Sequence, residues 1–228
     1  MTTAPAELES RKQAAAERAL ELVKPGTIVG LGTGSTARYF IQGLARMVRS
    51  GFNVRAVATS QESQAIAEAG GISITERIDG SLDLAVDGAD EIDPAFNCVK
   101  GRGGALLREK VVAHASRRFV LIADEGKLVG RLGRGRVPIE VLPFLWEATS
   151  RSIESLGGRP ELRMAAGGPF KTDNGNLVLD TGFGDVDAAL GRALHEIPGV
   201  IEHGLFFGVA RAAIIGSGTG IRILGELP

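Results

Sequence analysis

The stretch TIVGLGTGSTARYFIQGLARMVRS, residues 27–50, decides how the chain begins to fold. It opens with the apolar run TIVGLG, continues through the small polar turn TGST, and ends in a segment whose apolar residues recur at helical spacing. This order is typical of a strand, a tight loop and a helix. Glycine in such a loop either permits the sharp turn or brings the backbone close to a ligand.

The same alternation continues to about residue 133. Expected strands lie at 53–59, 72–75, 82–86 and 118–124, and expected helices at 6–23, 60–70 and 104–115. Apolar strands that alternate with helices predict a mostly parallel sheet covered on both faces. In such sheets the ligand binds beyond the carboxyl ends of the strands. We expect the ligand there because GTGST (32–36), DGADEID (87–93) and ADEGK (123–127) follow or end expected strands.

From about residue 134 the order changes to strand, helix, strand, strand, helix, strand, which is the ferredoxin-like order. The expected elements are 138–143, 144–157, 160–165, 176–181, 185–197 and 200–206, with a turn at 173–175. The tail, 210–224, contains two short strands around a glycine turn and is expected to return to the first domain. The predicted fold class is therefore α/β: a Rossmann-like, mostly parallel sheet domain, 1–133 plus 208–228, with an inserted ferredoxin-like (βαββαβ) domain, 134–207.

Composition excludes several classes of function. Lys and Arg (26) almost balance Asp and Glu (27) over 228 residues, without a basic stripe, so no nucleic-acid partner is expected. The single cysteine, Cys98, excludes an intrachain disulfide and fits a reducing compartment. No apolar run approaches the roughly 20 residues that span a bilayer, and the N-terminus is unlike a signal peptide. We expect a cytoplasmic protein without a membrane partner.

The loop GLGTGSTA, residues 30–37, favours an anion because it opens a helix. A dinucleotide site would need an acidic residue at the end of the next strand, but that strand ends in Ala58-Thr59-Ser60-Gln61. A nucleotide-triphosphate cradle would need Gly-Lys-Ser/Thr, which is absent. Two interpretations are left: a modest anion site that uses Thr33, Ser35 and Thr36, or a tight turn with serine as the helix N-cap.

The segment DGADEID, residues 87–93, carries four carboxylates in seven residues. It is a solvated acidic loop, a divalent-metal site, or a site that accepts hydrogen bonds from the hydroxyls of a polyol. The spacing does not match the EF-hand loop, and no histidine or cysteine accompanies the acids, so no metal is expected.

The segment KGRGGALLREK, residues 100–110, places Lys100 before a glycine-rich turn that opens a helix. Lys100 and the backbone of 101–104 could hold an anion or an oxyanion. Glu109 follows in the second turn of the expected helix, where a solvated charge is the alternative to a catalytic base. His114, His195 and His203 lie outside every glycine loop and are interpreted as surface or satisfied core residues.

Together these parts favour one kind of chemistry. An anion cradle, acids that bind hydroxyls, a lysine and a spare carboxylate suit a small sugar phosphate, and nothing supplies a redox cofactor. The reaction that needs only these parts is proton transfer between adjacent carbons of a hydroxy-carbonyl compound, which is aldose–ketose isomerisation through an enediolate.

The sequence also resembles a known family. GLGTGSTA, VDGADEID, KGRGGALLREK, ADEGK, PIEVLP and LGGRPELR occur in the order and approximate spacing of the type A ribose-5-phosphate isomerases, over essentially the whole chain. The resemblance implies interconversion of ribose 5-phosphate and ribulose 5-phosphate in the pentose phosphate pathway. It also implies that no metal or organic cofactor takes part and that the protein is a homodimer or homotetramer.

The resemblance further implies roles for individual residues. Glu109 corresponds to the base that moves the C2 proton to C1, Asp87 to the group that contacts the sugar oxygens and aids ring opening, and Lys100 to the stabiliser of the enediolate. The implied substrate-contacting residues are Thr33, Gly34, Ser35, Thr36, Asp87, Gly88, Ala89, Asp90, Lys100, Gly101, Arg102, Gly103 and Lys127. Arg102 stands where many members have glycine and could add a contact to phosphate.

Overall fold

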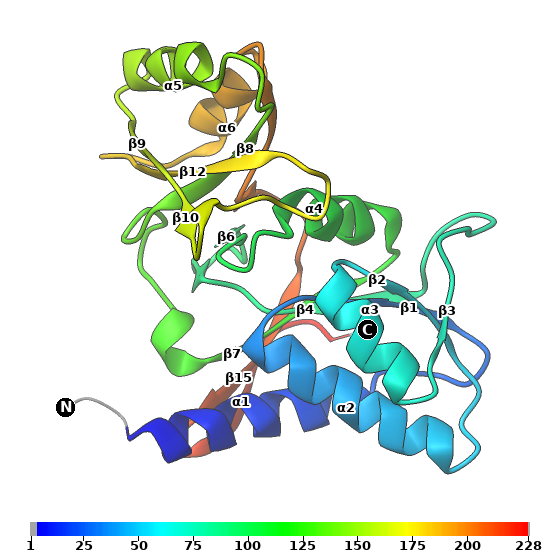
Figure 1. The fold of residues 1–228 in the computed structure, drawn as a ribbon. Coiled ribbons are helices and arrows are strands. Elements are labelled where there is room, and N and C mark those ends of the chain that lie inside the picture. The colour runs from blue at the N-terminus through cyan, green and yellow to red at the C-terminus, as the bar shows by residue number, and fades with distance from the viewer. Residues whose placement is uncertain (1–3, 228) are drawn as a thin grey trace. The chain divides into compact units, whose positions relative to one another are not determined.

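A computed structural model describes residues 4–227, which divide into two compact units (Figure 1). The first unit contains the residues up to Ala89, Arg108–Leu128, and the residues from Gly208 on. The second contains Asp90–Leu107 and Val129–Phe207.

The first unit is built on a seven-stranded sheet in the order β16-β15-β7-β4-β1-β2-β3. Its strands are β1 (Ile28–Leu31), β2 (Arg55–Ala58), β3 (Ser73–Ile74), β4 (Leu84–Asp87), β7 (Phe119–Asp124), β15 (Ala212–Ser217) and β16 (Gly220–Gly225). Neighbouring strands are parallel except for β16, which pairs antiparallel with β15. The predicted mostly parallel sheet and the predicted return of the tail to it are confirmed.

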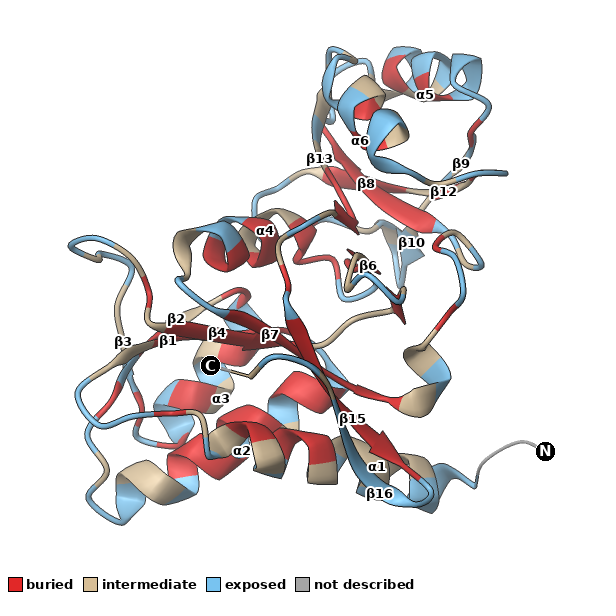
Figure 2. Cartoon of the chain, turned by 180° about the vertical axis from the view of Figure 1, so that it is seen from behind, coloured by how far each residue is buried: buried red, intermediate tan, exposed pale blue. Residues whose placement is uncertain are grey.

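Helices cover both faces of this sheet. They are α1 (Pro5–Leu20), α2 (Ser35–Arg49), α3 (Gln61–Ala69) and α4 (Leu106–Ala115). Figure 2 shows α1, α2 and α3 on one face and α4 on the other. Helix α4 packs closely, because a Cβ at Gly30 of β1 would lie 2.5 Å from Val112. The prediction of a sheet covered on both faces is confirmed.

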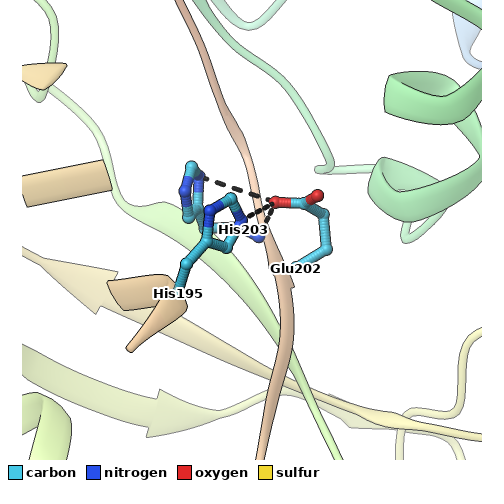
Figure 3. A group of neighbouring side chains, drawn as sticks. All are labelled: His195, Glu202 and His203. Carbon is cyan, nitrogen blue, oxygen red and sulfur yellow. Dashed lines mark hydrogen bonds and ion pairs between the residues drawn. The ribbon is translucent and has the colours of Figure 1, made fainter. Parts of the chain in front are cut away.

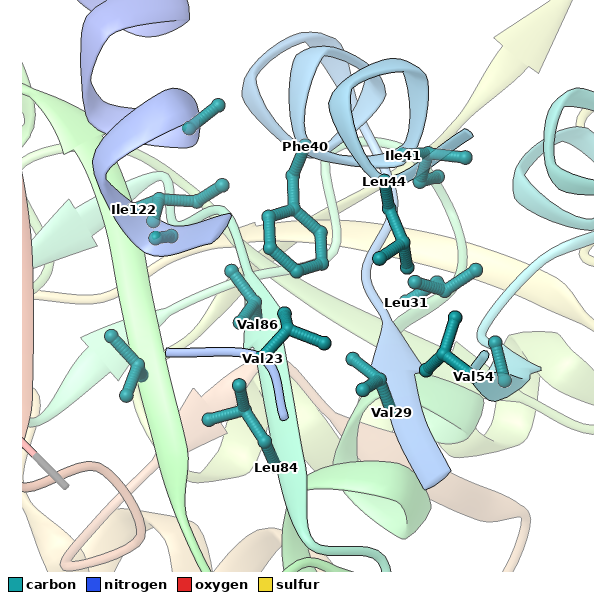
Figure 4. Packing of buried hydrophobic residues seen from close by; sticks show 14 of the residues in the cluster. Val23, Val29, Leu31, Phe40, Ile41, Leu44, Val54, Leu84, Val86 and Ile122 are labelled. Atoms are coloured by element: carbon teal, nitrogen blue, oxygen red, sulfur yellow. The ribbon is translucent and has the colours of Figure 1, made fainter. Parts of the chain in front are cut away.

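The main core lies between the sheet and helices α1 and α2. Apolar residues of α2 recur at helical spacing, so Phe40, Ile41 and Leu44 share the face that meets the sheet. Figure 4 shows Phe40 pointing from α2 toward the strands that carry Leu31 and Val86. Burial of each such side chain contributes about 1.5–3 kcal/mol to folding.

The second unit contains a four-stranded antiparallel sheet in the order β13-β8-β12-β9. Its elements in chain order are β8 (Val137–Val141), α5 (Trp146–Ser155), β9 (Arg159–Leu162), β12 (Leu177–Gly182), α6 (Ala188–His195) and β13 (Val200–His203). This is the predicted βαββαβ order. A small hairpin, β10 (Met164–Ala165) and β11 (Gly168–Pro169), precedes the expected turn at 173–175.

The units divide at different points from the predicted boundaries, 134–207 and the rest. Residues 90–107 carry β5 (Glu91–Ile92) and β6 (Cys98–Val99), which pair with each other, and β6 also pairs with β14 (Leu205–Phe206). Residues 90–107 therefore belong with the second unit. Short strands of two residues give almost no periodic signal, so the sequence did not indicate this pairing.

Candidate functional site

The carboxyl edge of the first sheet brings three predicted segments together. Strands β1, β4 and β7 are parallel neighbours, so the loops that follow them lie at one edge. These loops carry Thr33–Thr36, Asp87–Ala89 and Lys127. These residues of GTGST, DGADEID and ADEGK therefore lie at one edge of the first unit's sheet, as expected.

Asp87 joins two of these loops. Its Oδ1 accepts hydrogen bonds from the amides of Thr33 (3.0 Å) and Gly88 (2.7 Å). The side chain is only 2% exposed, and a Cβ at Gly32 would lie 2.1 Å from Oδ1. Glycine at position 32 is required because Asp87 occupies the space of a side chain there.

The hydroxyl of Thr33 is held inside the protein. Its Oγ1 lies 2.7 Å from Oγ1 of Thr59 and 2.9 Å from Oγ of Ser60, and the hydroxyl of Ser63 donates to the carbonyl of Gly32 (2.7 Å). The prediction that the Thr33 hydroxyl takes part in an anion site is not supported by these contacts. The hydroxyl cluster instead fixes the loop from beneath, with partners that follow the next strand.

Helix α2 begins at Ser35, and Gly34 is its N-cap with φ 103°. No described side chain caps this end, so the interpretation of serine as the N-cap is wrong. The amides of a helix's first turn lack partners within the helix, and the dipole makes this end positive. This end of α2, with the side chains of Ser35 and Thr36, has the properties that bind an anion.

Strand β7 ends in an acid that the sequence analysis did not single out. Asp124 is 4% exposed and its Oδ1 accepts a hydrogen bond from Gly126 (2.9 Å), but Oδ2 has no hydrogen-bond partner among the described residues. The next turn, η1 (Glu125–Lys127), carries Lys127, which is partly exposed. The signal for Asp124 was its position as the last residue of an otherwise apolar strand.

Glu109 lies in the first turn of α4, not in the second, because the helix begins at Leu106. It is 4% exposed, so the alternative of a solvated helix charge is wrong. Burial of a carboxylate is costly, and the positive end of the helix dipole favours its charge. A buried acid at a helix N-terminus is a candidate for proton transfer.

The remaining predicted residues, Asp90 and Lys100–Gly103, belong to the second unit. Lys100 is 2% exposed; its amide donates to the carbonyl of Gly204 (2.8 Å), and its Nζ lies 5.7 Å from the centre of the Phe206 ring. A lysine is rarely buried this deeply unless its charge has a function or a partner.

Asp90 and Arg102 contact each other. The backbone amide of Arg102 donates to Oδ2 of Asp90 (3.1 Å). The side-chain Nε of Arg102 lies 3.7 Å from Oδ1 of Asp90. Gly101 in the same loop has φ 105°, a conformation that favours glycine. The predicted phosphate contact of Arg102 must compete with this pairing.

Each acid of the 87–93 segment binds backbone amides at a different place. The contacts of Asp87 and Asp90 are given above. Glu91 accepts hydrogen bonds from the amides of 133–135 at 2.7, 3.3 and 2.5 Å. Asp93 accepts hydrogen bonds from the amides of Ala95 (2.8 Å) and Asn97 (2.9 Å). Glu91 is 5% exposed, so the interpretation of the segment as a solvated acidic loop is wrong for this residue. The four charges stabilise separate turns, which reduces their mutual repulsion.

Among the described residues, His195, Glu202 and His203 form the cluster with donor atoms close enough to suggest a metal (Figure 3). His203 already uses both ring nitrogens: Nδ1 accepts from the amide of Leu205 (3.2 Å), and Nε2 donates to the carbonyl of Gly191 (3.0 Å). Nε2 of His195 lies 2.8 Å from Oε1 of Glu202. The interpretation of His203 as a satisfied core residue fits these contacts, and a metal would have to break them.

Helices among residues 4–227 are all too short or too polar to cross a membrane.

Comparisons with known proteins identify the family to which the chain is similar. Residues 55–220 match the family described as ribose 5-phosphate isomerase A (phosphoriboisomerase A). Ribose-5-phosphate isomerase A of Thermomicrobium roseum is 48% identical over 223 residues, which cover 95% of this chain and 94% of that protein.

Solved structures share the fold over nearly the whole chain. Ribose 5-phosphate isomerase A of Methanocaldococcus jannaschii is 35% identical, with a TM-score of 0.92 over 96% of this chain and 99% of that one. A D-ribose-5-phosphate isomerase in complex with phospho-erythronic acid is 38% identical, with a TM-score of 0.93 over the same shares of the two chains, 96% and 99%. The chain belongs to the ribose 5-phosphate isomerase A family.

Proposed function

We propose that the chain interconverts D-ribose 5-phosphate and D-ribulose 5-phosphate by proton transfer through an enediolate. The observation that carries this proposal is the burial of Glu109 in the first turn of α4, directly after a glycine-rich loop. Family membership supports the substrate pair.

Glu109 acts as the general base. Its carboxylate removes the proton from C2 of the open-chain aldose, the C2–H electrons form the C1–C2 double bond, and the carbonyl oxygen on C1 takes the negative charge. Glu109 then returns the proton to C1 while the proton of the C2 hydroxyl moves to the oxygen on C1, which leaves the ketone at C2. A positioned base of this kind contributes about 10²–10⁴-fold to the rate.

Lys100 stabilises the negative charge of the enediolate. Its burial removes competing water, so its charge acts at full strength on a nearby oxyanion. Groups of this kind contribute about 10²–10³-fold each. Lys100 and Glu109 together supply the acid–base chemistry and the charge stabilisation of the reaction without a metal or an organic cofactor.

The phosphate binds at the uncapped start of α2, to the amides and hydroxyls of Ser35 and Thr36 and to the backbone of Gly34. Lys127 follows β7 at the same edge of the sheet and supplies a positive charge. Asp87 accepts hydrogen bonds from the sugar oxygens and assists ring opening. The other residues of the proposed substrate-contacting set are Gly88, Ala89, Asp90, Gly101, Arg102 and Gly103. Thr33 supports the loop instead, because its hydroxyl and its amide are bonded within the protein. The relative solved with phospho-erythronic acid supports a ligand that carries hydroxyls, a phosphate and, at the other end of its carbon chain, anionic oxygens.

We also propose that the enzyme acts in the cytoplasm as a homodimer or homotetramer, without nucleic-acid or membrane partners. The balanced charge and the single buried cysteine support the proposed compartment and the lack of a nucleic-acid partner. Sedimentation of the purified protein measures the oligomeric state.

The test is an assay of ketose formation from ribose 5-phosphate with the wild type and the Glu109→Gln variant. We expect kcat to fall by at least about 10²-fold, because the amide cannot accept the C2 proton. Glu147→Gln is the matched control, since Glu147 also lies in the first turn of a helix, α5, but is exposed. Near-normal turnover by Glu109→Gln would remove Glu109 from the role of base.

A further inference from the structure

Arg163 contacts the loop 100–104 from the sheet of the second unit. Its Nη1 donates to the carbonyl oxygens of Gly101 (3.1 Å) and Arg102 (3.0 Å). These contacts join residues that lie 62 and 61 positions apart in the sequence. The last residue of the LGGRPELR segment therefore binds the loop that follows Lys100.

The guanidinium of Arg163 is itself fixed by Asp180. Nε donates to Oδ2 (2.8 Å) and Nη2 to Oδ1 (2.5 Å), while the two side chains are only 13% and 25% exposed. A paired Arg–carboxylate contact of this kind holds the guanidinium plane in one orientation. The pair also balances its own charge, so Arg163 contributes geometry more than an electric field.

Phe170 completes the support. The guanidinium of Arg163 lies 5.5 Å from the centre of its ring, and a Cβ at Gly104 would lie 2.4 Å from its Cζ. Gly104 has φ 79°, so the loop turns sharply where it meets the ring. Both ends of the loop are therefore constrained, one by the guanidinium and one by the ring.

The register of the sheet explains this placement. Leu177 and Leu179 of β12 belong to the core formed with Ile153 of α5 and Leu194 of α6. Side chains alternate along a strand, so Asp180 lies on the opposite face. Arg163 directly follows Leu162, the partner of Leu179, and shares the face of Asp180. The face opposite α5 and α6 is thus the one that supports the loop.

Holding a carbonyl also directs an amide. In a planar trans peptide the N–H points opposite to the C=O, and the described residues contain no cis peptide. Arg163 holds the carbonyl of Arg102, so the amide of Gly103 points away from Arg163. The preceding peptide is fixed at both ends, by Arg163 at the carbonyl of Gly101 and by Asp90 at the amide of Arg102.

We propose that Arg163 is a positioning residue for the isomerase reaction: it orients the peptides of 101–103 so that the Gly103 amide donates to the substrate's anionic oxygens. This inference rests on the proposed function. Asp180 and Phe170 keep the guanidinium in place and act through it.

The experiment compares Arg163→Met and Arg163→Lys with the control Arg136→Met. Arg136 lies in the same unit and also binds a carboxylate, Glu161, and a carbonyl, that of Asp180 (3.0 Å), but it is exposed and has no described contact with 100–104. For each protein, kcat and KM for ribose 5-phosphate are measured, together with hydrogen exchange of the amides of 100–104 and affinity for phospho-erythronic acid.

We expect Arg163→Met to lower kcat/KM by about 10–100-fold and to speed hydrogen exchange in 100–104, because displacement of a positioned group by about 1 Å has effects of this size. Arg163→Lys is expected to restore part of the loss, since an ammonium reaches one carbonyl but lacks the fork that binds Asp180. Arg136→Met should match the wild type in kinetics, hydrogen exchange and affinity for phospho-erythronic acid.

The outcomes separate the two proposals. An inactive wild type contradicts the proposed function itself. An active wild type together with unchanged kcat and KM in Arg163→Met contradicts the positioning role, whether or not exchange in the loop increases. If Arg163→Met does not fold, Arg163→Lys decides: wild-type kinetics in that variant also contradict the role, whereas a lower kcat with an unchanged melting temperature supports it.

Discussion

Two glycine-rich loops, 32–36 in the first unit and 100–104 in the second, are held in different ways. The first follows a parallel strand and is fixed by Asp87 at the end of the neighbouring strand. The second follows the two-residue strand β6 and is fixed by Arg163 and Phe170, which come about sixty residues later. One loop takes its geometry from the sheet to which it belongs, and the other takes it from side chains of a distant sheet.

The difference shows where precision in the two loops originates. At the edge of a parallel sheet, strand ends already lie about 4.8 Å apart, so a single carboxylate reaches across to the next loop. A loop without such neighbours needs a longer side chain with several donors, and arginine has five. An aspartate thus fixes the backbone of the loop in the first unit, and an arginine fixes the backbone of the loop in the second.

The largest expected effect comes from Gly32→Ala, which breaks the first arrangement. The new methyl group would overlap Asp87, at 2.1 Å from Oδ1 and 2.6 Å from Cα. We expect the free energy of unfolding to fall by about 3 kcal/mol, measured by urea denaturation, and isomerase activity to fall with it. Gly130→Ala is the control, because a Cβ there meets nothing within 4 Å. Equal stability of the two variants would contradict the tight approach of Asp87.

An intermediate effect is expected from Glu91→Gln, which tests the second unit. The carboxylate accepts three amides of 133–135, and the glutamine side chain would place its own N–H₂ group against amide donors. Hydrogen bonds to a charged group are worth about 1.5–3 kcal/mol, so we expect a loss of about 2 kcal/mol of stability.

The matched control for this change is Glu161→Gln. Glu161 is exposed and pairs with Arg136, and surface pairs of this kind contribute about 0–1 kcal/mol. If Glu161→Gln destabilised the protein as much as Glu91→Gln, the hydrogen bonds of Glu91 to the amides of 133–135 would not be the source of the lost stability.

The smallest expected effect concerns Tyr39→Phe in the first unit, because this link lies at the surface. The hydroxyl of Tyr39 donates to Glu9 (2.8 Å); this bond raises the pKa of Tyr39 above 10.0, and bonds from Lys12 and then Tyr39 lower the pKa of Glu9 below 4.5. The contribution of Glu9 to folding stability is therefore present above about pH 4.5 and is lost as the pH falls through the pKa of Glu9 in the folded protein. That of Tyr39 is present below pH 10 and is lost as the pH rises.

We expect Tyr39→Phe to lower the melting temperature by no more than about 2 °C at pH 7. The gap between the variant and the wild type should shrink at pH 3, because a fall in pH favours the protonated form of Glu9. Melting curves at both pH values test this. A gap of the same size at the two pH values would show that the bond to Glu9 is not the source of the effect.

The sequence predicted what depends on periodicity and on strand ends. Apolar alternation indicated both sheets, and the position of Asp87 directly after an apolar run placed it at the carboxyl edge. These features depend on residues that are close in the sequence, which is where hydrophobic patterns are informative.

Contacts between distant side chains were not predictable in this way. The inward turn of the Thr33 hydroxyl depends on Thr59 and Ser60, which lie 26 and 27 residues later, and the support of Gly101 depends on Arg163. Pattern and propensity report which face of an element is buried, but not which donor meets which acceptor. Asp90 and Glu91 illustrate this limit, because neighbouring acids bind amides in unrelated turns.

The division of the chain between its units has a consequence for synthesis on the ribosome. The chain passes from one unit to the other after residues 89, 107, 128 and 207. Strand β7 pairs on one side with β15, which follows the last residue of the second unit in the chain. Until β15 emerges, a nascent chain carries all residues of the second unit, whereas strand β7 of the first unit still has an open edge, so the second unit can be completed before the first.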